Sequence, residues 1–509
     1  MPTEEEFNLH SFGWQNDPEE ERFKLCAIDY LSTITYTNTV IFFKLHDTEK
    51  RSVHNHSMHW RSSLLILQNS KAVAVLKEGF ERTLAQVRHI LGTIEKDDDG
   101  YHSIVRKKIS TFQFVVQYLD SPEEVFPSFD EIAEAHYLSP ILGDISVLAN
   151  HPMTCGNKPE AHPDNSPIVA SAKANFIPGG LILNLSFHHW ANGLYGFVSF
   201  VEQLSENCYA VANGTELPSF DPRCLDRSIF GHFEVDGLSS MESQVETPGR
   251  LKRNLQHKHS QAIFFHLPKS KAQELKKLAS PKDGSWISTF NAVCALLWRV
   301  SLRIREPLYK PGLNYKPLWA GGVTIHHLFT NHPMPKRMQG NLQIDITSEM
   351  SNVPQLTLGE IISEAPLSIL AMYTREVLES VNLDTLTTVL NKVSRVRNKP
   401  DLSINVDSFP PMSLLTSDWR KANFCALDFG FGKPTAFRHL FGGVPLCQVV
   451  IYPPRVGPAG DDEGIEVQLT FETELMSKLV NDPEWSRYFE FRGIDAWEKG
   501  FPDSQKAKL

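Results

Sequence analysis

His188 and His189 are the residues whose type and position best suit them for chemistry. An imidazole titrates near neutral pH, so it can take a proton from a hydroxyl or an amine and return it to a leaving group. Adjacent histidines after an apolar strand are also common packing residues. The pair alone therefore leaves two interpretations open, a general base or a packing role.

The elements around the pair place it at a corner of the fold. Apolar and polar residues alternate before it, which predicts a strand with one buried face. Beyond Gly193 the apolar spacing lengthens, as in a helix. The strand residues are Leu181, Leu183, Leu185 and Phe187, and the helix residues are Phe197, Phe200, Val201 and Leu204. An imidazole at such a strand-to-helix corner can face a cleft.

Composition narrows the class of protein. The chain has 509 residues, 41% hydrophobic and 22% charged, which is long enough for two or three globular domains. Its net charge of -10 argues against a nucleic-acid partner. There is no long apolar run, so no membrane span is expected, and the acidic start argues against a secretory signal. Seven cysteines without a CxxC pair fit free thiols in a reducing compartment, and no metal-ligand spacing is present.

The last three residues are Ala507, Lys508 and Leu509. Ser-Lys-Leu at this position is a peroxisomal address, and Ala-Lys-Leu is a close variant of it. Chance is the competing explanation for so short a match. The sequence therefore predicts delivery to the peroxisome through an import receptor, or otherwise a cytoplasmic location.

Strands alternate with helices in both halves, which favours an α/β (α+β) fold of two lobes with a cleft between them. A helix is expected from Ser70 to about Leu91, and another after Ser288 and Thr289. Residues 213–258 lose periodicity and gain proline and glycine, as in a linker. The predicted units are an acidic arm (1–22), a first lobe (23–212), the linker (213–258), a second lobe (259–500) and an exposed tail (501–509).

Two motifs, in order, give the chain a resemblance to the BAHD acyltransferase family in its fungal form. The family's HxxxDG motif is read as His188, Asn192 and Gly193, and its DFGWG motif as Asp428-Phe429-Gly430-Phe431-Gly432. Weaker matches are Asp226-Arg227-Ser228, the segment 287–299 and Gly340-Asn341. The resemblance covers nearly the whole chain.

The resemblance implies two chloramphenicol-acetyltransferase-like lobes with a channel between them. It implies a monomer with no permanent cofactor, in which acyl-CoA is a co-substrate and the motif histidine is the general base, without an acyl-enzyme. The expected activity is transfer of a short acyl group to a hydroxyl or amine of a specialised metabolite. In the resembled fold Ser288 and Thr289 lie at a helix start facing the channel, which makes them weak CoA-binding candidates, although helix capping explains them equally well.

The histidine pair makes the assignment of the base ambiguous. His188 keeps the three-residue gap to Asn192 and is preferred, whereas His189 becomes the rival base if the loop is one residue shorter than usual. The family's acid at position 192 is structural and paired with an arginine of the second lobe. Because that arginine would fall near His326 and His327, we expect a hydrogen bond from Asn192 to one of these imidazoles instead.

The second motif also departs from the family, since Phe431 replaces its tryptophan. Asp428 can bond local N–H groups, while Gly430 and Gly432 permit unusual backbone angles, so we expect a structural motif away from the chemistry. Two other functions stay open. One is a cyclisation, condensation or rearrangement without CoA on the same fold, and the other is a non-catalytic protein that binds a metabolite or partner.

Overall fold

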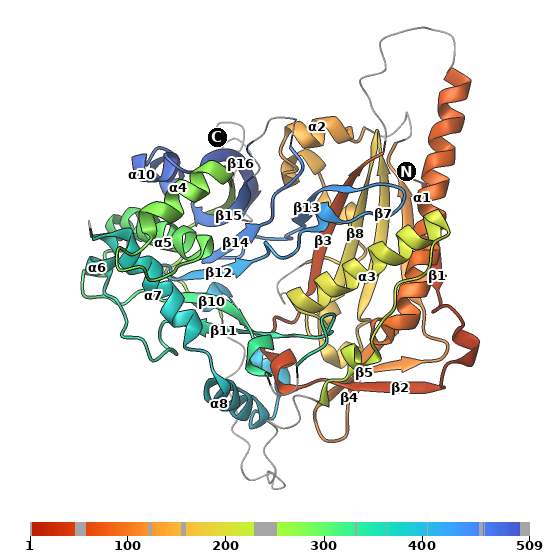
Figure 1. Cartoon of the computed structure of the whole chain (residues 1–509), viewed down its shortest axis with the longest axis horizontal. Helices are drawn as coiled ribbons and strands as arrows, with labels where there is room; N and C mark the ends of the chain where they lie inside the picture. The colour runs from red at the N-terminus through yellow and green to blue at the C-terminus, as the bar shows by residue number, and fades with distance from the viewer. Residues whose placement is uncertain are drawn as a thin grey trace.

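The computed structural model describes most of the chain in two lobes, each built on a mixed β-sheet (Figure 1). The described residues are 3–45, 58–120, 125–153, 159–228, 252–330, 333–363, 365–404, 406–457, 462 and 464–498, with side chains left out at 58–67 and 159. This arrangement confirms the predicted α/β fold of two lobes.

The first lobe is organised around a sheet with the strand order β1-β6-β7-β8-β3-β13. Every residue of β7 and β8 is buried, because protein covers both faces of the sheet. Helices α1 and α3 pack together over one face, and α2 lies over the other. The bounds are β1 Thr3–Leu9, β3 Tyr36–Lys44, β6 Phe112–Tyr118, β7 Ala170–Ile177, β8 Gly180–His188, β13 Pro434–His439, α1 Met58–Gln86, α2 Phe129–Glu134 and α3 Leu194–Asn213.

The prediction that residues 1–22 form a loose acidic arm is wrong. Strand β1 pairs antiparallel with β6 along its whole length, and β2 (Glu20–Lys24) joins a smaller sheet with β5 (His102–Lys107) and β4 (Thr93–Lys96). The acidic side chains of β1 are exposed at the sheet edge, whereas Leu9 is buried. Charged residues are common on edge strands, so acidity did not mark a loose arm here.

The second lobe has a sheet with the order β11-β10-β12-β14-β15-β9-β16, covered by helices on its outer side (Figure 1). Helix α5 is buried almost throughout, between α4, α7 and the sheet. The strands are β9 Ser260–Leu267, β10 Trp319–Thr324, β11 Gln343–Thr347, β12 Leu414–Asp418, β14 Gln448–Tyr452, β15 Ile465–Glu472 and β16 Glu490–Trp497. The helices are α4 Lys269–Ala279, α5 Thr289–Tyr309, α6 Leu358–Ile362, α7 Leu367–Glu379, α8 Leu383–Ser394, α9 Met476–Val480 and α10 Pro483–Ser486.

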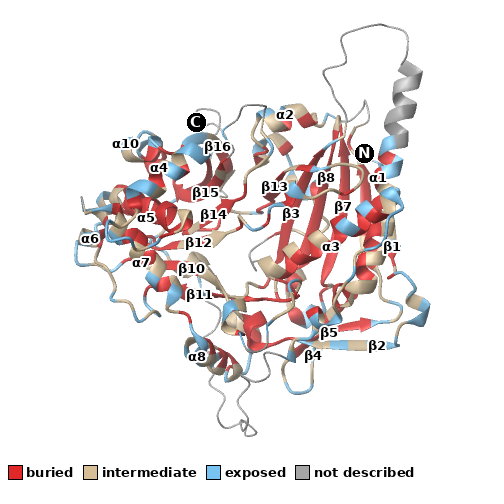
Figure 2. Ribbon diagram, in the orientation of Figure 1, coloured by how far each residue is buried: buried red, intermediate tan, exposed pale blue. Residues whose placement is uncertain are grey.

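One strand of the second half belongs to the first lobe. Strand β13 pairs antiparallel with β3, with Phe437 opposite Ile41 and His439 opposite Thr39. The chain then returns to the second sheet in β14. Figure 2 shows buried residues running through both sheets and through β13 between them. The two lobes are therefore joined by shared β-structure as well as by the linker, which sequence periodicity did not indicate.

Across the described part of the chain, no helix is both long and apolar enough to cross a membrane. The cysteines whose positions are described are all free thiols.

Candidate active site

The two histidines have different surroundings at the end of strand β8, since the strand ends at His188 and His189 begins the following turn. His188, the last residue of β8, is fully buried. Its Nε2 lies 2.7 Å from the carbonyl oxygen of Ala161, and its Nδ1 accepts the N–H of Trp190 at 3.2 Å. Burial lowers the pKa of His188 to about 4, so this imidazole stays neutral. Both of its nitrogens are already engaged within the protein.

His189 instead lines a cavity of about 110 Å³ between the two lobes. Thr33, Thr35 and Thr37 line this cavity from the first lobe. Ser417, Trp419 and Gln448 line it from the second lobe. The walls are mostly apolar, with hydroxyls, an amide and two imidazoles as polar groups. We call this the inter-lobe cavity, and its described lining contains His189 but not His188.

The environment of His189 keeps its ring neutral at ordinary pH. Burial lowers the pKa of His189, and an interaction with its own backbone carbonyl partly opposes that effect. Nδ1 is buried and makes no hydrogen bond to another described residue. Nε2 is therefore the ring nitrogen available to the cavity. A neutral imidazole with an available Nε2 has the form required of a general base.

Asp345 lies on β11 within electrostatic range of His189. Its side chain is exposed to solvent, yet the surrounding protein raises the pKa of its carboxyl group.

The loop after His189 is fixed by the segment 339–341 of the second half. Asn192 accepts the N–H of Gly340 at 2.7 Å and donates to the side chain of Gln339 at 3.1 Å. Asn341 donates to the carbonyl oxygen of His189 at 2.9 Å. A Cβ on Gly193 would lie 2.5 Å from the Asn341 side chain, so the glycine permits this close approach. The backbone that carries the His189 ring is thus held from both sides.

A buried ion pair supports the same loop. Arg227 bonds Asp29 at 2.6 Å and the carbonyl oxygen of Ala191 at 2.7 Å. Asp29 also accepts both the backbone and the side-chain N–H groups of Asn341. Sequence reasoning missed Asp29, although it singled out Arg227 and Asn341 within motif-like segments. The ionic support for the loop therefore comes from the linker and the first lobe rather than from position 192.

The expected hydrogen bond from Asn192 to His326 or His327 is wrong. His326 bonds the hydroxyl of Thr324 at 2.6 Å, and His327 bonds the carbonyl oxygen of Thr324 at 2.8 Å. Both histidines belong to a short 3-10 turn after β10, which ties their rings to their own strand end. Asn192 instead bonds Gln339 and Gly340, which come later in the chain.

The DFGFG segment lies apart from the cavity and packs against the first lobe. Phe429 and Phe431 contact Phe43, with ring centroids 5.1 and 5.3 Å away. Asp428 accepts the N–H of Gly430, whose φ is +76°. Gly432 does not have a positive φ, so only one of the two glycines needs the unusual backbone angle. These contacts are structural.

Ser288 and Thr289 start helix α5 and are not brought to the inter-lobe cavity. Ser288 accepts the N–H of Asn291, and the Asn291 side chain accepts the N–H of Ser288, which completes a capping box. Capping accounts for Ser288. A role of Ser288 and Thr289 in CoA binding stays a prediction.

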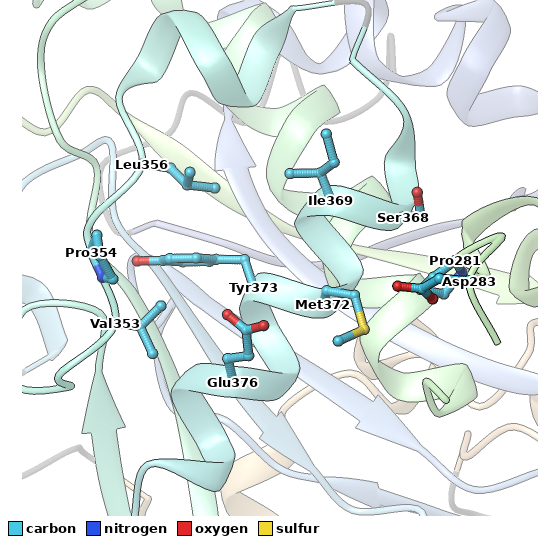
Figure 3. A pocket seen from close by; sticks show the side chains of 10 residues that line it. All are labelled: Pro281, Asp283, Val353, Pro354, Leu356, Ser368, Ile369, Met372, Tyr373 and Glu376. Carbon is cyan, nitrogen blue, oxygen red and sulfur yellow. The ribbon is translucent and has the colours of Figure 1, made fainter. Parts of the chain in front are cut away.

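A larger hollow, of about 430 Å³, lies on the second lobe, and Figure 3 shows its side chains. Met372, Tyr373 and Glu376 reach it from α7, while Val353 and Leu356 line it from the facing segment. No histidine lines it, and none of the sequence-predicted site residues does. Within the described residues there is also no group of acidic, histidine or cysteine side chains that could hold a metal ion. The inter-lobe cavity is therefore the better candidate for proton-transfer chemistry.

Sequence reasoning also missed His439, which lines the inter-lobe cavity with His189. It lies at the end of β13, where Phe437, His439 and Phe441 alternate with other residues. That alternation was a signal for a strand that presents one imidazole to a cleft, but the pairing of β13 with β3 was needed to place it.

Comparison with known proteins matches the chain to acyltransferases. The Transferase family profile matches residues 151–486, and the profile of the trichothecene 3-O-acetyltransferase-like N-terminal domain matches residues 36–208. Acetyltransferase FGR3 of Gibberella zeae is 42% identical over 97% of this chain and 95% of its own length. Trichothecene 3-O-acetyltransferase TRI101 of Fusarium sporotrichioides is 23% identical, over 83% of this chain and 90% of its own.

Solved structures share the fold. Fusarium graminearum TRI101 complexed with coenzyme A and T-2 mycotoxin matches with a TM-score of 0.71 and 19% identity, over 93% of this chain and all of that one. Vinorine synthase matches with a TM-score of 0.62 and 15% identity, over 94% of this chain and 96% of that one. The chain belongs to the Transferase family, the BAHD acyltransferases. Its class of activity is acyl-CoA-dependent acyl transfer.

Proposed function

We propose that this chain transfers an acetyl or other short acyl group from acyl-CoA to a hydroxyl of a small, largely apolar metabolite, with His189 as the general base. One observation carries the assignment of the base. Of the two adjacent imidazoles, only His189 lines the cavity between the lobes, while His188 bonds Ala161 and Trp190 inside the first lobe.

The reaction needs alignment and proton transfer rather than a covalent intermediate, because a thioester is already activated. Nε2 of His189 takes the proton of the acceptor hydroxyl as its oxygen attacks the thioester carbonyl. The tetrahedral adduct then collapses and the carbon–sulfur bond breaks. The imidazolium returns its proton to the CoA thiolate, which restores the neutral base.

The lining of the cavity supports the choice of acceptor class. Among the described residues, neither a carboxylate nor an ammonium group lines it, and threonine and serine hydroxyls are spread over apolar walls. Such a surface favours an uncharged molecule that carries oxygen functions. The TRI101 structures hold T-2 mycotoxin or deoxynivalenol together with CoA, and an acceptor of comparable character fits this proposal.

The assembly and location are part of the proposal. Both walls of the cavity come from one chain, which supports a monomer as the active unit. The terminal Ala507-Lys508-Leu509 lies outside the described residues and supports import into the peroxisome, where acyl-CoA is formed.

Calorimetry with acetyl-CoA and with free CoA, followed by a turnover assay, tests the proposal. Purified protein is incubated with acetyl-CoA and a panel of hydroxylated metabolites, and the products are scanned for the mass gain of an acetyl group. Binding of both CoA species together with an acetylated product is expected. No CoA binding would favour a CoA-independent reaction or a binding protein, and binding without any product would favour the non-catalytic alternative.

A further inference from the structure

His439 faces the inter-lobe cavity from β13, the strand that joins the two halves. Its ring lies edge-on to Trp419, with ring centroids 4.3 Å apart, and is stacked on Phe441 at 5.2 Å. Two aromatic neighbours fix the plane of the imidazole. His439 is therefore a second, rigidly held polar group in the cavity of His189.

A buried tyrosine determines which nitrogen of His439 carries the proton. Nδ1 of His439 lies 2.8 Å from the hydroxyl of Tyr452. Burial raises the pKa of Tyr452, so the hydroxyl keeps its proton. The backbone of His439 lowers the same pKa, as an N–H that donates to the phenol oxygen would. The phenol oxygen thus accepts an N–H, and its own hydrogen is left to donate to Nδ1, 2.8 Å away. The remaining nitrogen, Nε2, then carries hydrogen and is the donor left for the cavity.

The surroundings of His439 also keep it neutral throughout a reaction cycle. Burial lowers its pKa to about 3, and the nearby His189 and Arg438 act in the same direction. When His189 accepts a proton, its new charge disfavours a charge on His439 still further. The two imidazoles therefore cannot exchange roles: one has a lone pair for the cavity, and the other has an N–H.

We propose that Nε2–H of His439 donates a hydrogen bond to the acyl carbonyl oxygen as that oxygen becomes the tetrahedral oxyanion. The inference deepens the proposed function and rests on it. When the acceptor oxygen bonds to the carbonyl carbon, the electron pair of the C=O bond moves to oxygen, and the fixed N–H stabilises it. His439 forms no covalent bond and transfers no proton. Tyr452 is the positioning residue that holds the tautomer.

Other groups in the cavity can donate, but they are less fixed. Ser417 accepts the indole N–H of Trp419 at 3.0 Å, so its own O–H stays available. Thr33 and Thr35 already donate to the carbonyl oxygens of Ile404 and Tyr36, at 3.2 and 3.4 Å, and the hydroxyl of Thr37 can rotate. A donor that needs no reorientation during the reaction contributes most to stabilising a developing charge. Of the imidazole and these hydroxyls, His439 is the donor that meets this condition.

Two substitutions of similar size separate the donor from packing. His439→Gln keeps an N–H near the position of Nε2, whereas His439→Phe keeps an aromatic ring between Trp419 and Phe441 and removes the donor. Thiol release from acetyl-CoA is measured at saturating acetyl-CoA, with an acceptor found in the panel and with water alone. We expect His439→Phe to lower kcat about 100-fold or more in both reactions, with little change in the KM for acetyl-CoA. His439→Gln should recover at least a tenth of the wild-type rate.

The outcomes separate this inference from the proposed function. Equal activity of His439→Phe and wild type overturns it. So does a raised KM for the acceptor with water hydrolysis unchanged, because His439 would then only bind the acceptor. Equal losses in the Phe and Gln variants, with unchanged thermal unfolding, also overturn it. If wild type neither binds acetyl-CoA nor releases thiol from it, the proposed function fails, and this inference is overturned with it.

Discussion

The rings of His188 and His189 lie in different surroundings at the end of β8, and these surroundings give them different chemistry. His188 is closed in by Ala161 and Trp190, whereas His189 has Nε2 available to the cavity. The sequence placed the pair correctly at a strand-to-helix corner. It did not show which ring faces the cleft, because that depends on where β8 ends and on how the 339–341 segment holds the loop.

The pH dependence of catalysis should report the base. Burial lowers the pKa of His189, so the neutral, active form persists below the ordinary histidine pKa of about 6.5. Activity should be constant down to that pH and fall only when the ring gains a proton at lower pH. The pH profile of kcat/KM for acetyl-CoA measures this. An acid limb above pH 7 would contradict the assigned environment, and profiles restricted to pH values where the protein stays folded provide the control.

At the scale of elements, the catalytic loop depends on the contacts of Asp29, Arg227 and Asn341 more than on the motif residue Asn192 alone. The resemblance indicated a position for the loop support, but not its chemistry. Asp29 lies in a short 3-10 turn far from the motif in sequence, so no local pattern connected it with the loop. Long-range partners of this kind are decided by packing, which periodicity does not describe.

The Asp29–Arg227 pair gives a prediction about stability. Asp29→Leu leaves Arg227 buried without its carboxylate and should cost about 3–5 kcal/mol in the free energy of unfolding. The double variant Asp29→Leu with Arg227→Met should cost less than the two single changes added together, because no charge is left unpaired. Denaturant unfolding of the four proteins measures this. Strictly additive losses would show that the two side chains do not act as a pair.

The two glycines of the DFGFG segment provide a matched comparison. Gly430 has a φ of +76°, and an added Cβ would lie 2.4 Å from the Cβ of Ala212. Gly432 has ordinary contacts only, with Phe43 at 3.7 Å as the nearest. Gly430→Ala should therefore lower the free energy of unfolding by about 1–3 kcal/mol, while Gly432→Ala changes it little. Thermal unfolding tests this, and activity per folded molecule should survive both changes. Equal unfolding in the two variants would contradict a strained turn at Gly430.

At the scale of the whole molecule, two sheets and a shared strand form one cavity. The alternation of strands and helices predicted the lobes, and the linker separates most of their elements. Strand β13 could not be assigned to the first lobe from sequence, because its partner β3 lies nearly 400 residues earlier. His439 was missed for the same reason.

Cellular location is a property of the whole chain and is tested separately. If the terminal tripeptide is read by an import receptor, a fluorescent fusion at the N-terminus should give a punctate pattern that overlaps a peroxisomal marker. Removing Leu509 should disperse the signal, while replacing Ala507 by serine should preserve it. A pattern that does not change when Leu509 is removed would exclude this address.

The most direct test of the account compares the two neighbouring imidazoles in the same assay. His189→Ala should lower kcat/KM for acetyl transfer by about 10²–10⁴-fold, the usual contribution of a general base, with little loss of stability. His188→Asn should lower the unfolding temperature, because its ring bonds Ala161 and Trp190 in the core, yet retain activity per folded molecule within about tenfold. Near-normal transfer by His189→Ala, with folded His188→Asn inactive, would contradict the account.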